Sequence, residues 1–569
     1  NEQERLRQLQ ENTLNSNINL QFKSEYSQIS LTPNESPCFE IDVITLDTKS
    51  LEDNGLGFEV GLDSSLNLSP RDALGFSSIK TKFQSYLNSS LSTLGFKPGM
   101  CLGEKSINSV VTAFNNEIVA SGYITTTASL KPLNLKSKKL EFKPNVGTIN
   151  SISINNNDNQ RHRAMLFSAF GQINHNKPLN IRDIEQALEN ISNATFADVG
   201  ISLSPSAMAN STNIIISRTS RYLPFSLYLS LDNAGSRETS RYQASTTLSG
   251  INLLGFNEIY TLSLGKAVLN NERTNLKDDS KKGSSHNHYI NFTIPFGYYS
   301  LAYTNSRYSY DQIIAGVNNL YKYSGVSRVQ SLNLSYLFYR DQSIKSSVFI
   351  SLFKRDSKNY IEEFELKNQR RVTAGYEIGV KSQLNLNSSQ INSSLSYKRG
   401  TGMLGAIRAP EENIAEGTSR MRIWLLDIGY KHKLSNSLSY DANLHAQYNK
   451  SKLTIQDRLS IGGIYSVRGF DGQMSLVGQK GLYLRNMLSY NYTLNHAIYL
   501  ALDGGAVYDT TSQVHGSNKL AGAGVGIKGV FDIMGSNLSY DLLISRPLYK
   551  PEYFKSKDTH IGFRIGWRF

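Results

Sequence analysis

The last ten residues, His560 to Phe569, read HIGFRIGWRF and are the most informative stretch of the chain for its fold. Large apolar side chains alternate there with small or polar ones. Successive side chains of a β-strand point to opposite faces, so the segment is predicted to be a strand with one apolar and one polar face. The residues of the apolar face are Ile561, Phe563, Ile565, Trp567 and Phe569.

The same two-residue period recurs from about residue 221 to the end of the chain. It is clear in residues 438–449, 372–381 and 332–339. A soluble β-sandwich also alternates, because one face of each sheet packs on a core and the other meets water. These segments run for about 10 residues, however, which exceeds the ~5 to 6 of globular strands and suits a tilted crossing of a bilayer. Residues 221–569 accommodate about 16 such strands.

Composition favours a membrane barrel over membrane helices. Hydrophobic residues make up 39% of the chain, and the mean hydropathy is −0.35. No stretch approaches the ~18 to 20 apolar residues of a spanning helix. Because lipid cannot satisfy backbone polar groups, a closed barrel is the remaining way to cross a membrane. The 32 Tyr and 24 Phe, with 19% charged residues, are typical of aromatic girdles. We therefore predict a transmembrane β-barrel of about 16 antiparallel strands.

The net charge of +13 does not indicate a nucleic-acid partner. The basic residues are dispersed through predicted loops and strands, and no helix face or run concentrates them. A basic lumen, or basic loops that face lipopolysaccharide, account for the charge equally well. The first residues are polar, so we expect a mature chain from which a targeting signal has been removed.

The first 36 residues are expected to contain one short helix. Residues 1–15 are good helix formers with a weakly amphipathic pattern, and residues 16–36 read as a polar linker. A disordered tail is the alternative for this region.

Residues 37–155 are predicted to form a small α+β domain. A strand around Phe39 is followed by two helices with apolar residues at helical spacing, and then by strands at 124–130 and 140–154. The second helix stops at Gly122, a residue type that favours the left-handed conformation past a helix end. The predicted order is β-α-α-β-β.

Residues 156–220 are predicted to form a second domain of the same kind. Asn180 and Asp183 mark the start of a helix, and two strands follow near residues 199–203 and 213–217. Neither domain shows a catalytic constellation, so the pair is interpreted as an interaction arm.

Cys38 and Cys101 are the two cysteines of the chain. An even pair fits an oxidising compartment and one structural disulfide, while two unpaired buried thiols are the alternative.

The tetrapeptide VRGF, Val467, Arg468, Gly469 and Phe470, lies in a glycine-rich polar segment between two predicted strands. Asp503 follows in the stretch AIYLALDGGAVY, where strand parity turns its carboxylate inward. An inward carboxylate can bind an arginine from a loop folded into the lumen through a bidentate, charge-assisted pair. If the pair is dry, loss of one partner costs about 3 to 5 kcal/mol.

These motifs resemble those of the TpsB family, the outer-membrane transporters of two-partner secretion. VRGF and LALDGG are similar to the loop and wall motifs of the wider assembly and secretion superfamily. The stretch LSLDNAGSRETSRYQASTTLSGINLLG, which begins at Leu229, is similar to the first barrel strands of the family. PCFEID at Pro37, GMCLGEKSI at Gly99 and ASGYITT at Ala120 resemble its first POTRA domain, cysteine pair included. Phe563, Trp567 and the terminal Phe569 resemble the signal by which outer-membrane barrels are recognised for assembly.

The resemblance implies an N-terminal plug helix, two POTRA domains and a 16-stranded barrel in the bacterial outer membrane. It also implies export of a large exoprotein, an adhesin, haemolysin or inhibition toxin, which the POTRA domains capture by β-augmentation. No cofactor, metal or nucleotide hydrolysis is expected, and the other partners are outer-membrane lipid, lipopolysaccharide and the barrel assembly machinery. A monomer is expected. The short first helix and the long connection at residues 51–75 depart from the family pattern.

Three other functions compete with secretion. A barrel assembly factor shares VRGF and POTRA domains but usually carries more than the two that fit here. A passive channel needs no such domains, and a nonmembrane adhesin would use stacked sheets. An enzyme is not expected, because no nucleophile motif or phosphate-binding loop is present and His286 and His288 lack a third metal ligand in sequence.

Overall fold

A computed structural model describes residues 29–33, 35–47, 75–132, 137–155, 160–172, 177–195, 198–219, 223–268, 283–316, 319–509 and 518–569. The side chains of residues 75–80 are not described. The expected plug helix at 1–15, most of the linker and nearly all of the connection at 51–75 lie outside these residues. Contacts divide the chain into a barrel unit and a unit that precedes it in sequence, and each is described by itself.

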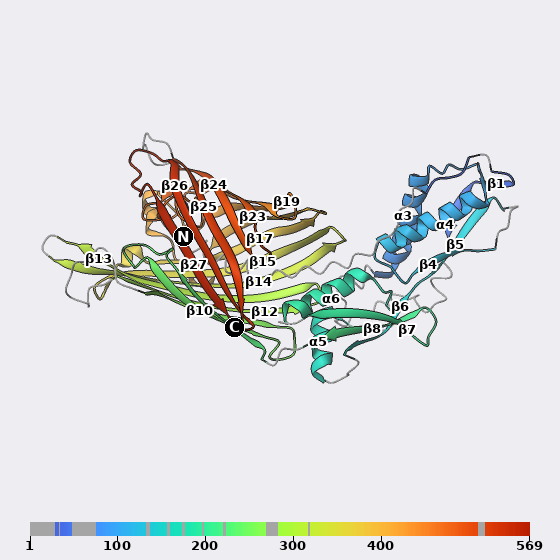
Figure 1. Cartoon of the computed structure of the whole chain (residues 1–569), viewed down its shortest axis with the longest axis horizontal. Helices are drawn as coiled ribbons and strands as arrows, with labels where there is room; N and C mark the ends of the chain where they lie inside the picture. Colours follow the sequence, from blue (N-terminus) through green and yellow to red (C-terminus); the bar gives the residue numbers. More distant parts are fainter. Residues whose placement is uncertain are drawn as a thin grey trace. The chain divides into compact units, whose positions relative to one another are not determined.

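The barrel unit is a closed antiparallel β-barrel of 16 strands, which confirms the predicted fold class (Figure 1). Short turns join the strands at one rim and longer loops at the other. The strands are β9 (Phe225–Asp232), β10 (Tyr242–Ile251), β11 (Ile259–Val268), β12 (Ser284–Phe296), β13 (Tyr299–Ala315), β14 (Leu320–Arg340), β15 (Ile344–Ile361), β17 (Arg371–Asn385), β18 (Ser389–Thr401), β19 (Arg422–Lys433), β20 (Leu438–Asn449), β23 (Lys480–Asn491), β24 (His496–Tyr508), β25 (Lys519–Ile533), β26 (Ser536–Tyr549) and β27 (His560–Arg568). A short piece, β16 (Phe364–Glu365), pairs only with the end of β15.

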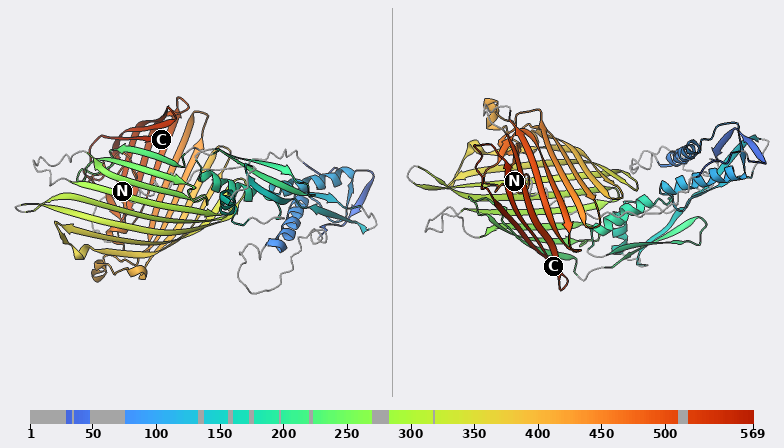
Figure 2. Two further views of the ribbon diagram at one scale, coloured as in Figure 1. Left: turned by 90° about the horizontal axis from the view of Figure 1, so that it is seen from below. Right: turned by 45° about the horizontal axis from the view of Figure 1, so that its top comes forward.

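The predicted alternation is visible in the exposure of β24. Leu500 and Leu502 are 54% and 57% exposed, whereas Tyr499, Ala501 and Asp503 are buried. Apolar side chains that face outward all along a strand are stable only against lipid, and the inward residues pack against the lumen contents. Figure 2 shows the strands tilted side by side around the barrel.

The barrel closes where the last strand meets the first. β27 pairs antiparallel with β9 over a short register, from Arg564↔Asp232 to Arg568↔Tyr228. Closure removes both sheet edges, which lipid would leave unpaired.

The other unit contains two small α+β domains. The first has β1 (Cys38–Ile41), β2 (Val43–Leu46), α3 (Gly75–Leu94), β3 (Met100–Gly103), α4 (Glu104–Ala120), β4 (Thr127–Leu130) and β5 (Lys139–Asn145). Its main sheet has the order β2-β5-β4, with β2 parallel to β5, and β1 pairs with β3 in a separate ribbon. Phe83, Phe114 and Phe142 are fully buried between the helices and the sheet.

The second domain repeats this topology. It has β6 (Thr148–Ile154), α5 (Gln160–Phe170), α6 (Ile181–Asn193), β7 (Val199–Pro205) and β8 (Ser211–Arg218), with sheet order β6-β8-β7 and β6 parallel to β8. Both domains are thus β-α-α-β-β units with the same strand order. None of the helices in the described part of the chain has the length and apolar character needed to cross a membrane.

The predicted domains need correction at one boundary and at two missed elements. The expected strand at 140–154 is two strands, and β6 belongs to the second sheet because it hydrogen-bonds to β8; the boundary placed after residue 155 therefore moves to residues 146–147. Sequence reasoning also missed α5, because its buried side chains, Met165, Leu166, Ser168 and Ala169, are few and partly polar, and β3, a four-residue strand that exists only through its pairing with β1.

Candidate functional site

The candidate site is the connection between β20 and β23, residues 450–479, here called the lumenal loop. It contains a 3-10 turn at Ile455–Asp457 and two short strands, β21 (Leu459–Ile461) and β22 (Leu476–Gly478). β21 and β22 pair antiparallel, from Leu459↔Gly478 to Ile461↔Leu476. The VRGF motif therefore lies in the tip of a folded loop, beyond a paired stem.

Arg468 of this tip binds Asp503 of β24, the two residues predicted to meet. Its Nε donates to Oδ2 at 2.6 Å and its Nη2 to Oδ1 at 2.7 Å, while the Arg468 backbone N–H donates to Oδ2 at 2.9 Å. Nη2 also donates to the carbonyl oxygen of Asn486 at 2.9 Å. The side chains are 7% and 0% exposed. In such a dry bidentate pair, removal of one partner leaves a buried charge and costs about 3 to 5 kcal/mol.

The neighbours of Arg468 explain the rest of the motif. Val467 and Phe470 are 0% and 1% exposed, and the Phe470 ring packs edge-on against Phe554 at 5.4 Å between centroids. Gly469 has φ +117°, and a Cβ there would lie 2.6 Å from the carbonyl oxygen of Arg546. Only glycine combines this conformation with so close a backbone approach.

The barrel wall has a matching glycine, Gly522 of β25, where the loop approaches it. A Cβ at this position would lie 1.9 Å from the carbonyl oxygen of Arg468. Gly522 and Leu520 of this strand are therefore a contact surface for the loop. Sequence reasoning missed Gly522; the only signal was the density of small residues in a strand that otherwise alternates.

A polar cavity of about 400 Å³ lies beside the tip inside the barrel. Charged side chains of both signs line it, including Asp441, Arg485, Lys528, Asp541 and Arg564. The Arg564 Nη2 donates to the Tyr465 hydroxyl of the loop at 3.2 Å. The lumen beside the tip is thus polar, and the loop occupies part of it.

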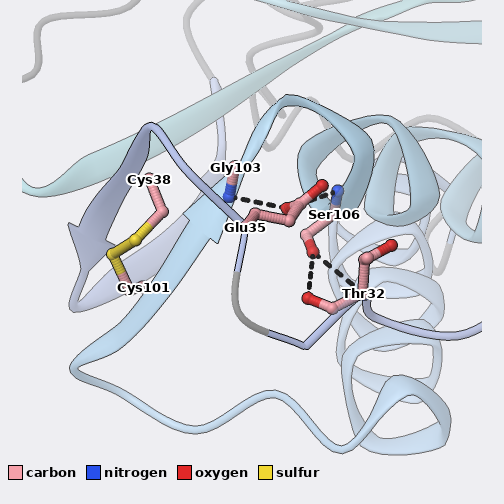
Figure 3. The surroundings of a disulfide bond; sticks show 6 residues. All are labelled: Thr32, Glu35, Cys38, Cys101, Gly103 and Ser106. Atoms are coloured by element: carbon pink, nitrogen blue, oxygen red, sulfur yellow. Dashed lines mark hydrogen bonds between the residues drawn. A yellow bond between two sulfur atoms is a disulfide. The ribbon is translucent and has the colours of Figure 1, made fainter.

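Cys38 and Cys101 form a disulfide, as predicted, with their Cα atoms 5.4 Å apart (Figure 3). The bond joins β1 to β3. Beside it, Glu35 binds the start of α4: its Oε2 accepts from the Gly103 N–H at 2.8 Å and the Ser106 N–H at 3.1 Å. Desolvation acts to raise the pKa of the Glu35 carboxyl, but these hydrogen bonds and one to the Ser106 side chain outweigh it and lower the pKa.

The aromatic residues predicted to signal barrel assembly lie on β27 and at its end. Trp567 and Phe569 are 41% and 47% exposed, and their rings stack at 5.1 Å. The Trp567 Nε1 donates to the Ser536 hydroxyl at 2.9 Å. Phe563 lies on the same strand and is partly buried. Their part in assembly stays a prediction.

The barrel, its folded loop and the tandem β-α-α-β-β domains define a class: an outer-membrane β-barrel preceded by POTRA domains, which are periplasmic in such proteins. A POTRA domain model matches residues 148–205, which cover β6 to β7. The model described as haemolysin secretion/activation protein ShlB/FhaC/HecB matches residues 210–529. The chain therefore belongs to this family, the TpsB transporters of two-partner secretion, and is located in the outer membrane.

Individual relatives agree with this assignment. The outer membrane transporter CdiB-2 of Burkholderia pseudomallei strain 1026b is 26% identical over 541 residues, which are 94% of this chain and 87% of the relative. The hemolysin transporter protein HpmB of Proteus mirabilis is 23% identical and is matched over 80% of this chain and 78% of its own length. The structure of CdiB from Acinetobacter baumannii shares the fold with a TM-score of 0.81 at 24% identity, over 100% of this chain and 98% of that one.

Proposed function

We propose that this protein secretes a large exoprotein through the barrel lumen, and that the lumenal loop is the obstruction that moves to let it pass. The observation that carries the proposal is the buried Arg468–Asp503 pair, which holds a folded loop against the inner wall through contacts of 2.6 and 2.7 Å. Beside this pair, Asp471 of the tip makes one longer ionic contact, with Arg237 at 3.8 Å. A loop tip attached at so few points has two discrete states, bound and released, and a translocating chain can select the released state.

The two POTRA domains, which we place at residues 38–145 and 148–218, are proposed to receive the exoprotein. Each sheet has edge strands, β2 and β4 in the first and β6 and β7 in the second. An edge strand presents unpaired N–H and C=O groups to which an extended polypeptide adds as another strand. This mode of capture requires no enzyme chemistry and no nucleotide.

The exported protein is proposed to be an adhesin, a haemolysin or an inhibition toxin. Relatives include proteins described as hemolysin transporters, HpmB and ShlB, as well as CdiB transporters. The reading frame beside the gene for this chain identifies the candidate to be tested. A passive channel has no use for a receiving arm, and a barrel assembly factor would not require a particular exported partner.

The proposal is tested with Arg468→Ala and Arg468→Lys in cells that also make the neighbouring exoprotein. Both variants lose the bidentate contact through which the loop regains its bound state, and the two-state cycle then fails. Exoprotein in the medium should therefore fall at least about tenfold for Arg468→Ala, and by less for Arg468→Lys, which keeps the charge. Arg422→Ala, at an exposed arginine at the start of β19, is the matched control and should secrete normally.

Heat-modifiable mobility shows whether each variant is inserted as a folded barrel. Unchanged secretion by an inserted Arg468→Ala protein would contradict the role assigned to the loop. Normal secretion in cells that lack this protein altogether would contradict the function itself.

A further inference from the structure

A second ion pair holds the lumenal loop at its base. Arg355 of β15 donates from Nη2 to Oδ1 of Asp457 at 2.6 Å and from Nη1 to the carbonyl oxygen of Gln456 at 3.3 Å. The two side chains are 8% and 2% exposed. A buried charge is tolerated only when it is paired and hydrogen-bonded, so each member of this pair depends on the other.

Asp457 is fixed within the loop before it meets Arg355. The Thr454 hydroxyl donates to its Oδ2 at 3.1 Å, and its N–H donates to the Thr454 carbonyl oxygen at 3.0 Å. Its own carbonyl oxygen accepts from the Gln447 Nε2 of β20 at 2.9 Å. These bonds set the carboxylate in the orientation that Arg355 needs, which lowers the conformational entropy lost in forming the pair.

Apolar contacts reinforce the same attachment. Leu453 is fully buried in a cluster with Phe353 of β15 and with Met421 and Ile423 at the start of β19. The backbone N–H of Thr418 also donates to the carbonyl oxygen of Lys452 at 3.0 Å. The base of the loop is therefore packed on the wall by both apolar and charged groups.

The pairs Arg468–Asp503 and Arg355–Asp457 lie on different parts of the barrel wall. The loop makes two further ion pairs, Arg458 with Asp509 at 2.9 Å and Asp471 with Arg237 at 3.8 Å. The tip pair is on β24 and the base pair on β15, and in the barrel order β17, β18, β19, β20 and β23 lie between them. Asp457 and Arg468 are separated along the loop by strand β21 and the turn that follows it. Release of Arg468 thus leaves the Arg355 attachment in place.

We propose that Arg355 and Asp457 are positioning residues that form a fixed root, about which the tip swings when Arg468 leaves Asp503. The loop then clears the lumen without leaving the barrel and returns to the same seat. This inference rests on the proposed function, since it assumes that the loop is the obstruction. It assigns different roles to the two pairs: the tip pair is the part that opens, and the root pair limits how far the loop moves.

The test is single-channel conductance of the full-length protein in planar lipid bilayers. Arg468→Ala, with the root intact, should add one defined open level. Arg355→Met, which removes the charge and keeps an unbranched apolar stem, should instead give transitions among several levels, at a frequency raised roughly tenfold or more. The exchange Arg355→Asp with Asp457→Arg should bring the transition frequency back toward the wild-type value. If Arg355→Met acted only by destabilising the barrel wall, this exchange would not restore the frequency.

Lys322→Ala is the matched control, because Lys322 pairs with Asp311 at 3.2 Å in a partly exposed site on the barrel, with side chains 44% and 29% exposed. It should leave the conductance unchanged. If Arg355→Met does not insert, Arg355→Lys retains the charge without the second hydrogen bond and should show a smaller rise in transition frequency. A wild-type trace from an inserted Arg355 variant would contradict the proposed root. An equal rise in transition frequency in the Lys322 variant would contradict it as well. An altered trace for Arg468→Ala with a normal one for Arg355→Met leaves the proposed function standing, whereas normal traces for both contradict the loop as obstruction.

Discussion

The side chain of Asn233 takes the place of a strand residue in the seam of the barrel, where it binds the backbone on both sides of Gly562. Its Oδ1 accepts from the Phe563 N–H at 2.9 Å, and its Nδ2 donates to the Ile561 carbonyl oxygen at 2.7 Å. Asn233 follows directly on β9, where the backbone register with β27 ends at Asp232. One amide side chain thus extends the closing seam toward the rim with the longer loops.

Asn233→Ala should weaken this closure. Two hydrogen bonds are lost and two backbone groups of β27 lose their partners, so the folded barrel should lose about 1 to 3 kcal/mol. The temperature at which the compact electrophoretic band converts to the unfolded one should fall by several degrees. Ser230→Ala, which removes one side-chain bond to Ser245 between β9 and β10, is the control. Equal conversion temperatures for the two variants would show that the seam gains nothing particular from Asn233.

Gly522→Ala should displace the loop tip although Arg468 and Asp503 are both present. The added Cβ would lie 1.9 Å from the carbonyl oxygen of Arg468, so the loop cannot keep its seat. Secretion should drop to the level of Arg468→Ala while the barrel still inserts. Gly504→Ala is the matched control on β24, because its Cβ would meet nothing closer than the Leu520 carbonyl oxygen at 3.8 Å. Normal secretion by Gly522→Ala would mean that the position of the loop tip against β25 is not needed for export.

Glu35 should make the start of α4 sensitive to pH. The pKa of its carboxyl is lowered in the folded protein, so its stabilising effect is complete above the ordinary pKa of glutamate and is lost as the pH falls through the lowered value. Amide exchange of residues 100–107 should therefore be slower in the wild type than in Glu35→Gln at neutral pH. The ratio of the two rates should approach one in acid. A ratio that stays constant across this pH range would exclude the charge as the cause.

Removal of the disulfide should destabilise the first α+β domain. The bond spans a sequence separation of 63 residues, for which the chain-entropy model gives about 4 kcal/mol of stabilisation. Cys38→Ser with Cys101→Ser should thus lower the first thermal transition of the detergent-solubilised protein by calorimetry and leave the barrel transition unchanged. A reductant should do the same to the wild type. A barrel transition that shifts as much as the first would argue against a local role.

Features encoded by local pattern were predictable from the sequence. Parity alone placed Asp503 on the inner wall, since Leu500 and Leu502 had to face lipid. The same alternation in residues 560–569 identified the last strand. For this reason the barrel and its approximate strand number follow from the order of the residues, whereas the pairing of Arg468 with Asp503 also depended on the resemblance of VRGF and LALDGG to known loop and wall motifs.

Features that depend on contacts between distant segments were not predictable. Arg355 and Asp457 are 102 residues apart in sequence, and nothing near either one indicates the other. Glu35 is 68 residues from Gly103, and its role as a helix cap appears only when β1 and β3 are paired. The placement of β6 failed for the same reason, because sheet membership is decided by β8 and not by the residues of β6 itself.

Site-specific photocrosslinking during export tests the route of the exoprotein most directly. A photoreactive residue is placed at Asn443 of β20, which lines the cavity beside Arg468, or at the adjacent Leu444, which strand parity turns outward. If the exoprotein crosses through the lumen, adducts with it should form from position 443 and not from position 444. Adducts from position 444 alone, or from neither position while secretion continues, would contradict passage through the barrel.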